Sequence, residues 1–109
     1  MPSYSKNEIV LIRYPFSDLS NAKVRPAVVV NAPHTSKDLI LVALTSKTAN
    51  LLTGEFVLKD WSLAGLNIET AVKRGIFTIH DRLVLKSVGF ISTADSTELE
   101  RSLHDWLGL

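Results

Sequence analysis

The chain has 109 residues, 46% of them hydrophobic, no cysteine and a formal net charge of +1 at pH 7. About 100 residues make one ordinary domain, so we expect a single domain over 1–109 rather than a two-domain enzyme. The lack of cysteine excludes disulfides and thiol chemistry, and no apolar run approaches the roughly 20 residues of a transmembrane helix.

The first half of the chain is predicted to form three strands separated by polar turns. Residues 8–14 are rich in the β-branched and aromatic residues typical of strands. The segment 15–23 interrupts them with Pro, Ser, Asp and Asn, which favour turns. Residues 27–31 and 38–45 are almost continuously apolar, which indicates strands that are buried on both faces. Pro26 lacks an N–H and fits the first residues of a strand.

Shorter elements follow in the second half. One helical turn is predicted over 61–66 and closed by Gly65. Gly75 separates two apolar pieces and is typical of a β-bulge. The predicted strands of this half are, in chain order, 54–58, 70–72, 76–79 and 88–91.

The last segment changes period from about 2 to about 3.6 and predicts a helix over about 93–107. We expect Thr93 as the N-cap, Asp95 in the first turn and Gly108 as the residue that ends the helix. Strands at short spacing with one terminal helix predict a mainly β fold, a small closed or nearly closed barrel that the helix covers in part. The apolar residues on one helical face are Leu99, Leu103, Trp106 and Leu107.

No catalytic or metal motif stands out locally. The five glycines are isolated, so there is no Gly-rich phosphate loop. The three histidines, His34, His80 and His104, lie in different segments without ligand spacing, so we expect neither a metal nor another cofactor. These residues alone indicate no more than a small β-barrel with a helix.

The charge is unevenly distributed along the chain. Residues 1–93 hold 11 Lys and Arg against 7 Asp and Glu, a net charge of +4, whereas residues 94–109 carry −3. The simplest interpretation is an acidic, solvated helix on a nearly neutral domain. The alternative is an anionic partner bound to the basic body, away from the acidic tail.

Two stretches in the first third of the chain are distinctive in their order: PFSDLS at 15–20 and RPAVVV at 25–30. They resemble the start of the MazF/PemK toxin family, and the likeness continues through 43–46 and 76–80 to the terminal helix. The resemblance implies an SH3-like barrel of the CcdB/MazF type that forms homodimers. It also implies a cytoplasmic toxin, inhibited by a cognate antitoxin, that cleaves single-stranded RNA at short sequences without a metal.

The resemblance also assigns two catalytic residues. Metal-free cleavage uses the ribose 2′-OH as nucleophile and leaves a 2′,3′-cyclic phosphate and a 5′-OH. Arg25 matches the family's arginine; a guanidinium suits charge stabilisation, but a pKa above about 12 suits proton transfer poorly, so its proton role stays open. Thr45 matches the family's threonine, whose hydroxyl donates to a phosphate oxygen. Without the family, an arginine at a barrel rim and a threonine in a turn are the simpler interpretations.

A second group of residues is expected to contact RNA. Phe16 either stacks on a base or anchors its loop in the core. Family members often have an Asp soon after the basic residue that precedes the 76–79 strand, but here Gly75 follows the basic pair. His80 is the nearby side chain that titrates near neutrality, and we consider it as a helper. The residues expected to contact RNA are Phe16, Ser17, Asp18, Lys23, Ser46, Lys73 and Arg74.

Two other functions remain open at this point. A gyrase poison of the CcdB type would use C-terminal helix residues, and Trp106 followed by Leu107 and Gly108 has a faint likeness to such a terminus. A catalytically inactive family member would bind RNA or its partner only. The presence of Arg25 and Thr45 argues against the gyrase poison. The lack of a carboxylate directly after Lys73 and Arg74 leaves the catalytically inactive family member as an alternative. The sequence does not give the bases that are recognised.

Overall fold

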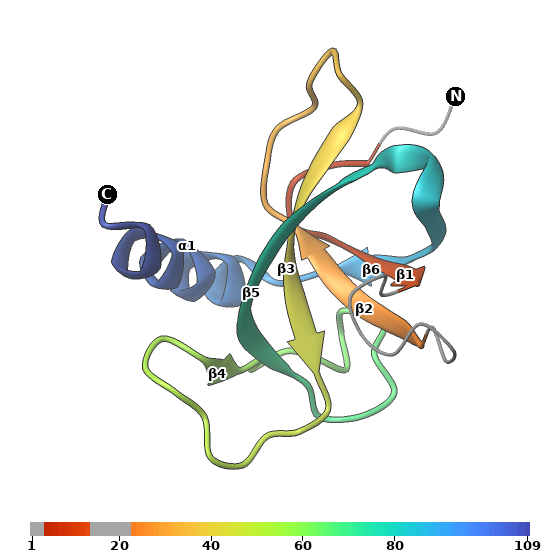
Figure 1. Ribbon diagram of the computed structural model, residues 1–109. Helices are drawn as coiled ribbons and strands as arrows, with labels where there is room; N and C mark the ends of the chain where they lie inside the picture. Colours follow the sequence, from red (N-terminus) through yellow and green to blue (C-terminus); the bar gives the residue numbers. More distant parts are fainter. Residues whose placement is uncertain (1–3, 14–22) are drawn as a thin grey trace.

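A computed structural model describes residues 4–13 and 23–109. Within these ranges the chain forms six strands, a short 3-10 helix and one α-helix (Figure 1). No helix in these ranges is long and apolar enough to cross a membrane. The elements are β1 (Glu8–Arg13), β2 (Val24–Val29), β3 (Asp38–Thr45), β4 (Phe56–Val57), β5 (Ala71–His80), η1 (Asp81–Leu83), β6 (Val84–Phe90) and α1 (Thr93–Leu107).

The strands form one antiparallel sheet in the order β4-β5-β3-β2-β1-β6. The sheet is strongly curved, the long strand β5 runs antiparallel beside β3, and α1 lies beside the sheet (Figure 1). Its two edges, β4 and β6, are not paired with each other in the described part of the chain. The predicted mainly β fold with a C-terminal helix is confirmed, but the sheet remains open.

The core has two layers because the central strands are buried on both faces, as their apolar runs predict. On β2, Val28 belongs to one cluster, and Ala27 and Val29 belong to the other. Helix α1 contributes Leu99 to the first cluster. The buried residues of this helix-facing cluster are Ile9, Val28, Val42, Leu44, Leu58, Ala64, Val72, Ile91 and Leu99. Those of the second cluster are Val10, Ile12, Ala27, Val29, Leu39, Leu41 and Ile79.

Several strand boundaries differ from the prediction. The two pieces predicted at 70–72 and 76–79 form one continuous strand, β5, because the backbone of the intervening residues stays extended. Strand β6 begins at Val84 rather than near 88, since pairing with β1 holds its exposed first half in the sheet. The strand predicted at 54–58 is reduced to Phe56–Val57, because Gly54 adopts a φ of 87° at its start.

Helix α1 has the predicted bounds but a different N-cap. The Ser92 hydroxyl, rather than that of Thr93, accepts a hydrogen bond from the Asp95 N–H at 3.2 Å. Ser92 precedes the first helical residue and has extended backbone angles, as an N-cap requires. Gly108 ends the helix in the left-handed conformation, as expected. Leu107 is exposed, so it does not belong to the buried face.

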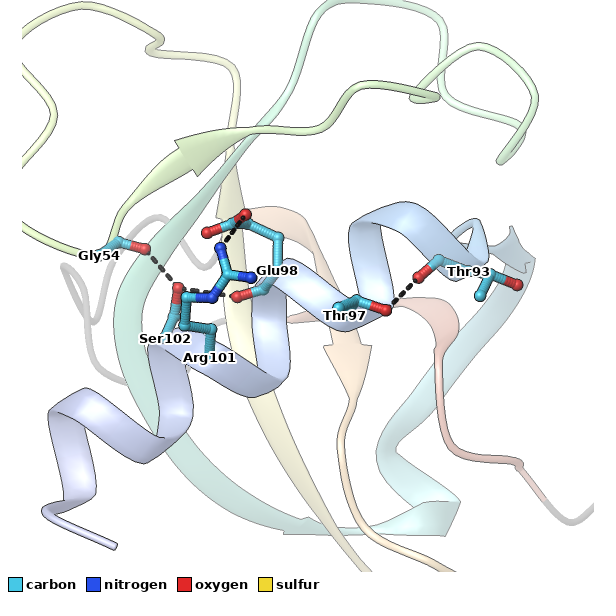
Figure 2. A network of polar contacts seen from close by, with 6 residues as sticks. All are labelled: Gly54, Thr93, Thr97, Glu98, Arg101 and Ser102. Atoms are coloured by element: carbon cyan, nitrogen blue, oxygen red, sulfur yellow. Dashed lines mark hydrogen bonds and ion pairs between the residues drawn. The ribbon is translucent and has the colours of Figure 1, made fainter.

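The second half of α1 holds the loop that precedes β4. The Ser102 hydroxyl donates to the Gly54 carbonyl at 2.7 Å, and the Trp106 indole N–H donates to the Thr53 carbonyl at 3.0 Å (Figure 2 shows the first bond). Trp106 therefore packs between helix and loop. This contact agrees with the packing interpretation of the tryptophan rather than with an exposed binding residue.

We expect Gly54→Ala to lower the free energy of unfolding by about 1–3 kcal/mol, because an added methyl overpacks this contact and the left-handed backbone strains an L-residue. A Cβ at Gly54 would lie 2.4 Å from the Trp106 indole nitrogen, at a φ of +87°. Gly108→Ala is the matched control, because its φ is +69° but a Cβ there meets nothing within 4 Å. Equal losses for both variants in urea unfolding would contradict the steric explanation.

Candidate active site

Arg25 and Thr45 lie on neighbouring strands at the same end of the sheet. The last paired residues of β2 and β3 at this end are Ala27 and Ala43, and Arg25 and Thr45 each lie two residues beyond this pair. Opposed residues in a sheet share a face, and alternate residues along a strand do too. Because Ala27 belongs to the second core cluster, both polar residues lie on the face of that cluster.

Arg25 and Thr45 also face residues of the two flanking strands, β1 and β5. Arg25 pairs with Ile12 of β1, and Thr45 pairs with Ala71 of β5. Ile12 and Ala71 are both buried, at 1% and 0% exposure. Each of the two polar residues therefore stands opposite one buried apolar residue of a flanking strand.

The Arg25 side chain is partly buried, and it forms no ion pair with any other described residue. A guanidinium presents five N–H donors in a planar fork that matches the oxygens of a phosphate. Arg25 can therefore provide paired hydrogen bonds to an anion at the end of β2.

Thr45 is held by the turn that follows β3. Its hydroxyl oxygen accepts a hydrogen bond from the Lys47 N–H at 3.1 Å. That bond uses a lone pair of the oxygen and leaves the hydroxyl proton to be donated elsewhere. The turn interpretation and the donor interpretation of this threonine are thus compatible, because the same backbone N–H that satisfies the turn also orients the hydroxyl.

The basic pair Lys73 and Arg74 lies on a bulge of β5, the strand next to Thr45. Val42 pairs with Ile76 and Leu44 with Val72, so two steps along β3 correspond to four along β5. The bulge expected near Gly75 is confirmed by this register shift. Both basic side chains are exposed, as are those of Lys23 and Ser46. The three expected RNA contacts Phe16, Ser17 and Asp18 lie outside the described residues.

A carboxylate stands at the basic pair although none follows the pair closely in the sequence. One oxygen of Glu55 accepts from the Arg74 N–H at 2.9 Å, and the other accepts from the Leu52 N–H at 2.8 Å. The hydrogen bond from the Arg74 N–H lowers the pKa of Glu55 the most, and the one from the Leu52 N–H lowers it next. The positive charge of Lys73 lowers the pKa further. Sequence reasoning missed Glu55, because it precedes the bulge by 19 residues and no local motif marks it.

His80 lies at the opposite end of the sheet. It pairs with Asp38 at the start of β3, seven residues before Thr45, a separation of roughly 20 Å along the strand. Its Nδ1 accepts from the Arg82 N–H at 3.1 Å and caps η1, with an Asp81 carboxylate oxygen at 3.2 Å. The described chain does not bring His80 to the end that holds Arg25 and Thr45, so this position gives the suggested helper role no support.

Titratable side chains do not gather into a metal centre here. Among residues 4–13 and 23–109, no three His, Asp or Glu side chains are arranged to hold a metal ion. The candidate site instead combines one guanidinium, one hydroxyl and an exposed basic bulge. Such an arrangement can bind a phosphodiester and stabilise negative charge on it.

Known proteins share this fold at low sequence identity. MazF from Deinococcus radiodurans is 16% identical, with a TM-score of 0.79 and all of both chains covered. An endoribonuclease from a Mycobacterial species is 17% identical, with a TM-score of 0.77, 100% of this chain and 95% of that chain covered. A MazE–MazF structure from Deinococcus radiodurans is 14% identical, with a TM-score of 0.76, 100% of this chain and 99% of that chain covered.

These identities show a shared fold alone, and no curated protein matches the chain significantly. The family comparison is more specific. Residues 5–107 match the model of the PemK-like, MazF-like toxins of type II toxin–antitoxin systems, which is nearly the whole chain. The chain therefore belongs to the PemK-like, MazF-like toxin family of type II toxin–antitoxin systems.

Proposed function

We propose that this toxin is a metal-independent endoribonuclease that cleaves single-stranded RNA at particular short sequences. The observation that carries the proposal is that Arg25 and Thr45 lie on one face of neighbouring strands, each two residues beyond the last pair of β2 and β3. Each residue has donors available for a phosphodiester in the described part of the chain. Similar solved structures are described as endoribonucleases, which gives the fold a precedent for this activity.

The proposed reaction is a transesterification followed by release of the products. The ribose 2′-oxygen forms a bond to the adjacent phosphorus and gives its proton to solvent, while the bond from phosphorus to the 5′-oxygen breaks and that oxygen takes a proton from solvent. The products are a 2′,3′-cyclic phosphate and a 5′-OH end. Arg25 donates to the non-bridging oxygens as negative charge builds on them, and Thr45 donates to one of these oxygens. Arg25 acts through its charge, because a guanidinium stays protonated.

The remaining groups are proposed to hold the RNA strand. Lys23, Lys73 and Arg74 are exposed cations near the proposed reaction centre and are assigned to neighbouring phosphates. Ser46, next to Thr45, and the loop residues Phe16, Ser17 and Asp18 are assigned to the nucleotides around the cleaved bond. Because phosphate contacts release counterions, RNA affinity is expected to fall as salt rises.

A partner protein is also proposed. A similar endoribonuclease from a Mycobacterial species has been solved in complex with its cognate antitoxin; it is 17% identical, with a TM-score of 0.76, 98% of this chain and 97% of that chain covered. This chain is proposed to bind an antitoxin whose acidic and apolar segment covers Arg25. It is also proposed to form a homodimer with a second copy of itself. An antitoxin complex that leaves Arg25 open to solvent would contradict this mode of inhibition.

The activity is tested directly with purified protein and a long single-stranded RNA in excess EDTA. We expect cleavage at a recurrent short sequence, detected by mapping the new 5′ ends. Because no step uses a metal, EDTA should leave the rate unchanged. An RNA that stays intact, or cleavage that EDTA abolishes, would contradict the proposed function.

For Thr45, we expect Thr45→Ala to lower the cleavage rate constant by about 10- to 100-fold, because one donor to the developing charge is lost. Thr45→Ser keeps the hydroxyl and should retain most of the activity. Thr97→Ala is the control, since it removes an exposed helix hydroxyl that donates only to the Thr93 carbonyl at 3.0 Å (Figure 2). Single-turnover rates that are equal for Thr45→Ala and wild type would exclude a role for this hydroxyl.

A further inference from the structure

The bulge of β5 needs a partner for its backbone. Between Val72 and Ile76 the ladder with β3 is interrupted, so the bulge cannot rely on regular strand pairing. A bulge normally leaves backbone groups without a partner in the ladder. The described structure satisfies one of them, the Arg74 N–H, with a side chain from another segment, Glu55.

Glu55 joins two segments through backbone contacts alone. Its carboxylate oxygens accept from the N–H groups of Arg74 and Leu52, and its own N–H donates to the Leu52 carbonyl at 2.9 Å. It forms no ion pair within 4.0 Å with Lys73 or Arg74. The carboxylate therefore fixes the course of the bulge and leaves both cationic heads available to an anion.

The segment that carries Glu55 is itself anchored on the helix. Thr53 and Gly54 receive hydrogen bonds from Trp106 and Ser102 of α1. Strand β4 follows at once and pairs with β5 at Val72. The described chain thus forms a continuous support that runs from α1 through the loop 52–55 to the basic bulge.

We propose that Glu55 is a positioning residue that holds Lys73 and Arg74 where they contact RNA phosphates. This role rests on the proposed function. A side chain whose backbone is fixed loses less conformational entropy when it binds, so the support strengthens RNA binding without touching the reacting atoms. Glu55 consequently affects the binding of RNA and not the rate of the bound complex.

Steady-state kinetics of RNA cleavage test the proposal. We expect Glu55→Ala to raise KM by about 5- to 20-fold with kcat within about 2-fold of wild type, because uniform binding is lost. Glu55→Gln retains the size of the side chain and one good acceptor, so its KM should lie between those of Glu55→Ala and wild type. Glu98→Ala is the matched control, because it removes a glutamate on α1 whose partner is Arg101 (Figure 2). Its KM should equal that of wild type.

A second background tests whether Glu55 acts through the basic pair. When Lys73 and Arg74 are both replaced by alanine, the two cations that Glu55 positions are gone. Glu55→Ala should then cause no further change in KM, since the effects of substitutions that act through the same contact do not add. An additional increase of the same size in this background would overturn the proposal, because it would show an effect independent of the two cations. So would an unchanged KM for Glu55→Ala in the wild-type background.

Binding to a mixed-sequence 2′-O-methyl RNA separates this proposal from the proposed function. This RNA carries the phosphates but lacks the attacking hydroxyl, so its Kd does not depend on cleavage. A weaker Kd for Glu55→Ala, by the same 5- to 20-fold, supports the positioning role even if the wild-type protein cleaves nothing. An unchanged Kd overturns the positioning role even if the wild-type protein is active.

Discussion

Replacing Arg25 with alanine is expected to lower the rate of RNA cleavage by about 100- to 1,000-fold or more, the usual cost of removing a donor to charge that develops in a transition state. Arg25 lies on the same face and at the same end of the sheet as Thr45, and it forms no ion pair with the other described residues. The alanine variant removes all the N–H donors of the guanidinium together with its positive charge. The effect should fall on kcat, because the interaction strengthens as charge builds on the phosphate.

Two further variants isolate the chemical role of Arg25. Arg25→Lys keeps the charge but not the planar fork, and should recover only part of the rate. Arg101→Ala, which removes an exposed arginine paired with Glu98 at 3.1 Å on α1, should be as active as wild type. The rates are measured under single-turnover conditions, with thermal unfolding as the folding control. A folded Arg25→Ala variant that cleaves at the wild-type rate would contradict the proposed role.

Replacing Asp95 with alanine is expected to lower the free energy of unfolding by about 3–5 kcal/mol, because two backbone donors lose their acceptors. Asp95 is 3% exposed, and its carboxylate oxygens accept from the N–H groups of Lys59 at 2.8 Å and Asp60 at 3.0 Å. It also places a negative charge in the first turn of α1, where the helix dipole favours one. The residue thus binds the start of the helix to the loop after β4.

Urea unfolding measures this loss. Asp95→Asn keeps one oxygen acceptor, so it should lower the free energy of unfolding by less than Asp95→Ala does. Asp105→Ala is the control, since Asp105 is an exposed aspartate on the same helix and should change the free energy of unfolding by less than about 0.5 kcal/mol. If Asp95→Ala were as stable as the Asp105 variant, the two backbone contacts would contribute nothing measurable.

The elements that the sequence predicts best are those whose apolar pattern is uninterrupted. Strand β3 has the predicted bounds because its apolar run is continuous and flanked by turn residues, and α1 has the predicted bounds because its 3.6-residue period starts abruptly. Strand β5 appeared as two pieces because Lys73 to Gly75 has the composition of a turn although it forms a bulge. The first half of β6 has no alternating pattern, and its extended form depends on pairing with β1.

The candidate site was predictable only where neighbouring strands carry it. Arg25 lies near the start of β2 and Thr45 ends the antiparallel neighbour β3, so the strand order places both at one end of the sheet. Glu55 reaches the basic bulge through folding, and its distance in sequence hid it. His80 seemed close because it follows the bulge by a few residues, but each residue of an extended strand adds about 3.3 Å. The roles of Phe16, Ser17 and Asp18 stay predictions.

The central claim is that a ribose hydroxyl is the nucleophile and that Arg25 stabilises the charge that results. The most direct measurement uses an RNA that contains the mapped cleavage site and a matched RNA with one 2′-deoxyribose at the cleaved nucleotide. We predict that the all-ribose strand yields a 2′,3′-cyclic phosphate and a 5′-OH, and that the substituted strand binds but is not cut there. Cleavage of the deoxy-substituted site, or a 5′-phosphate on the product, would contradict the account.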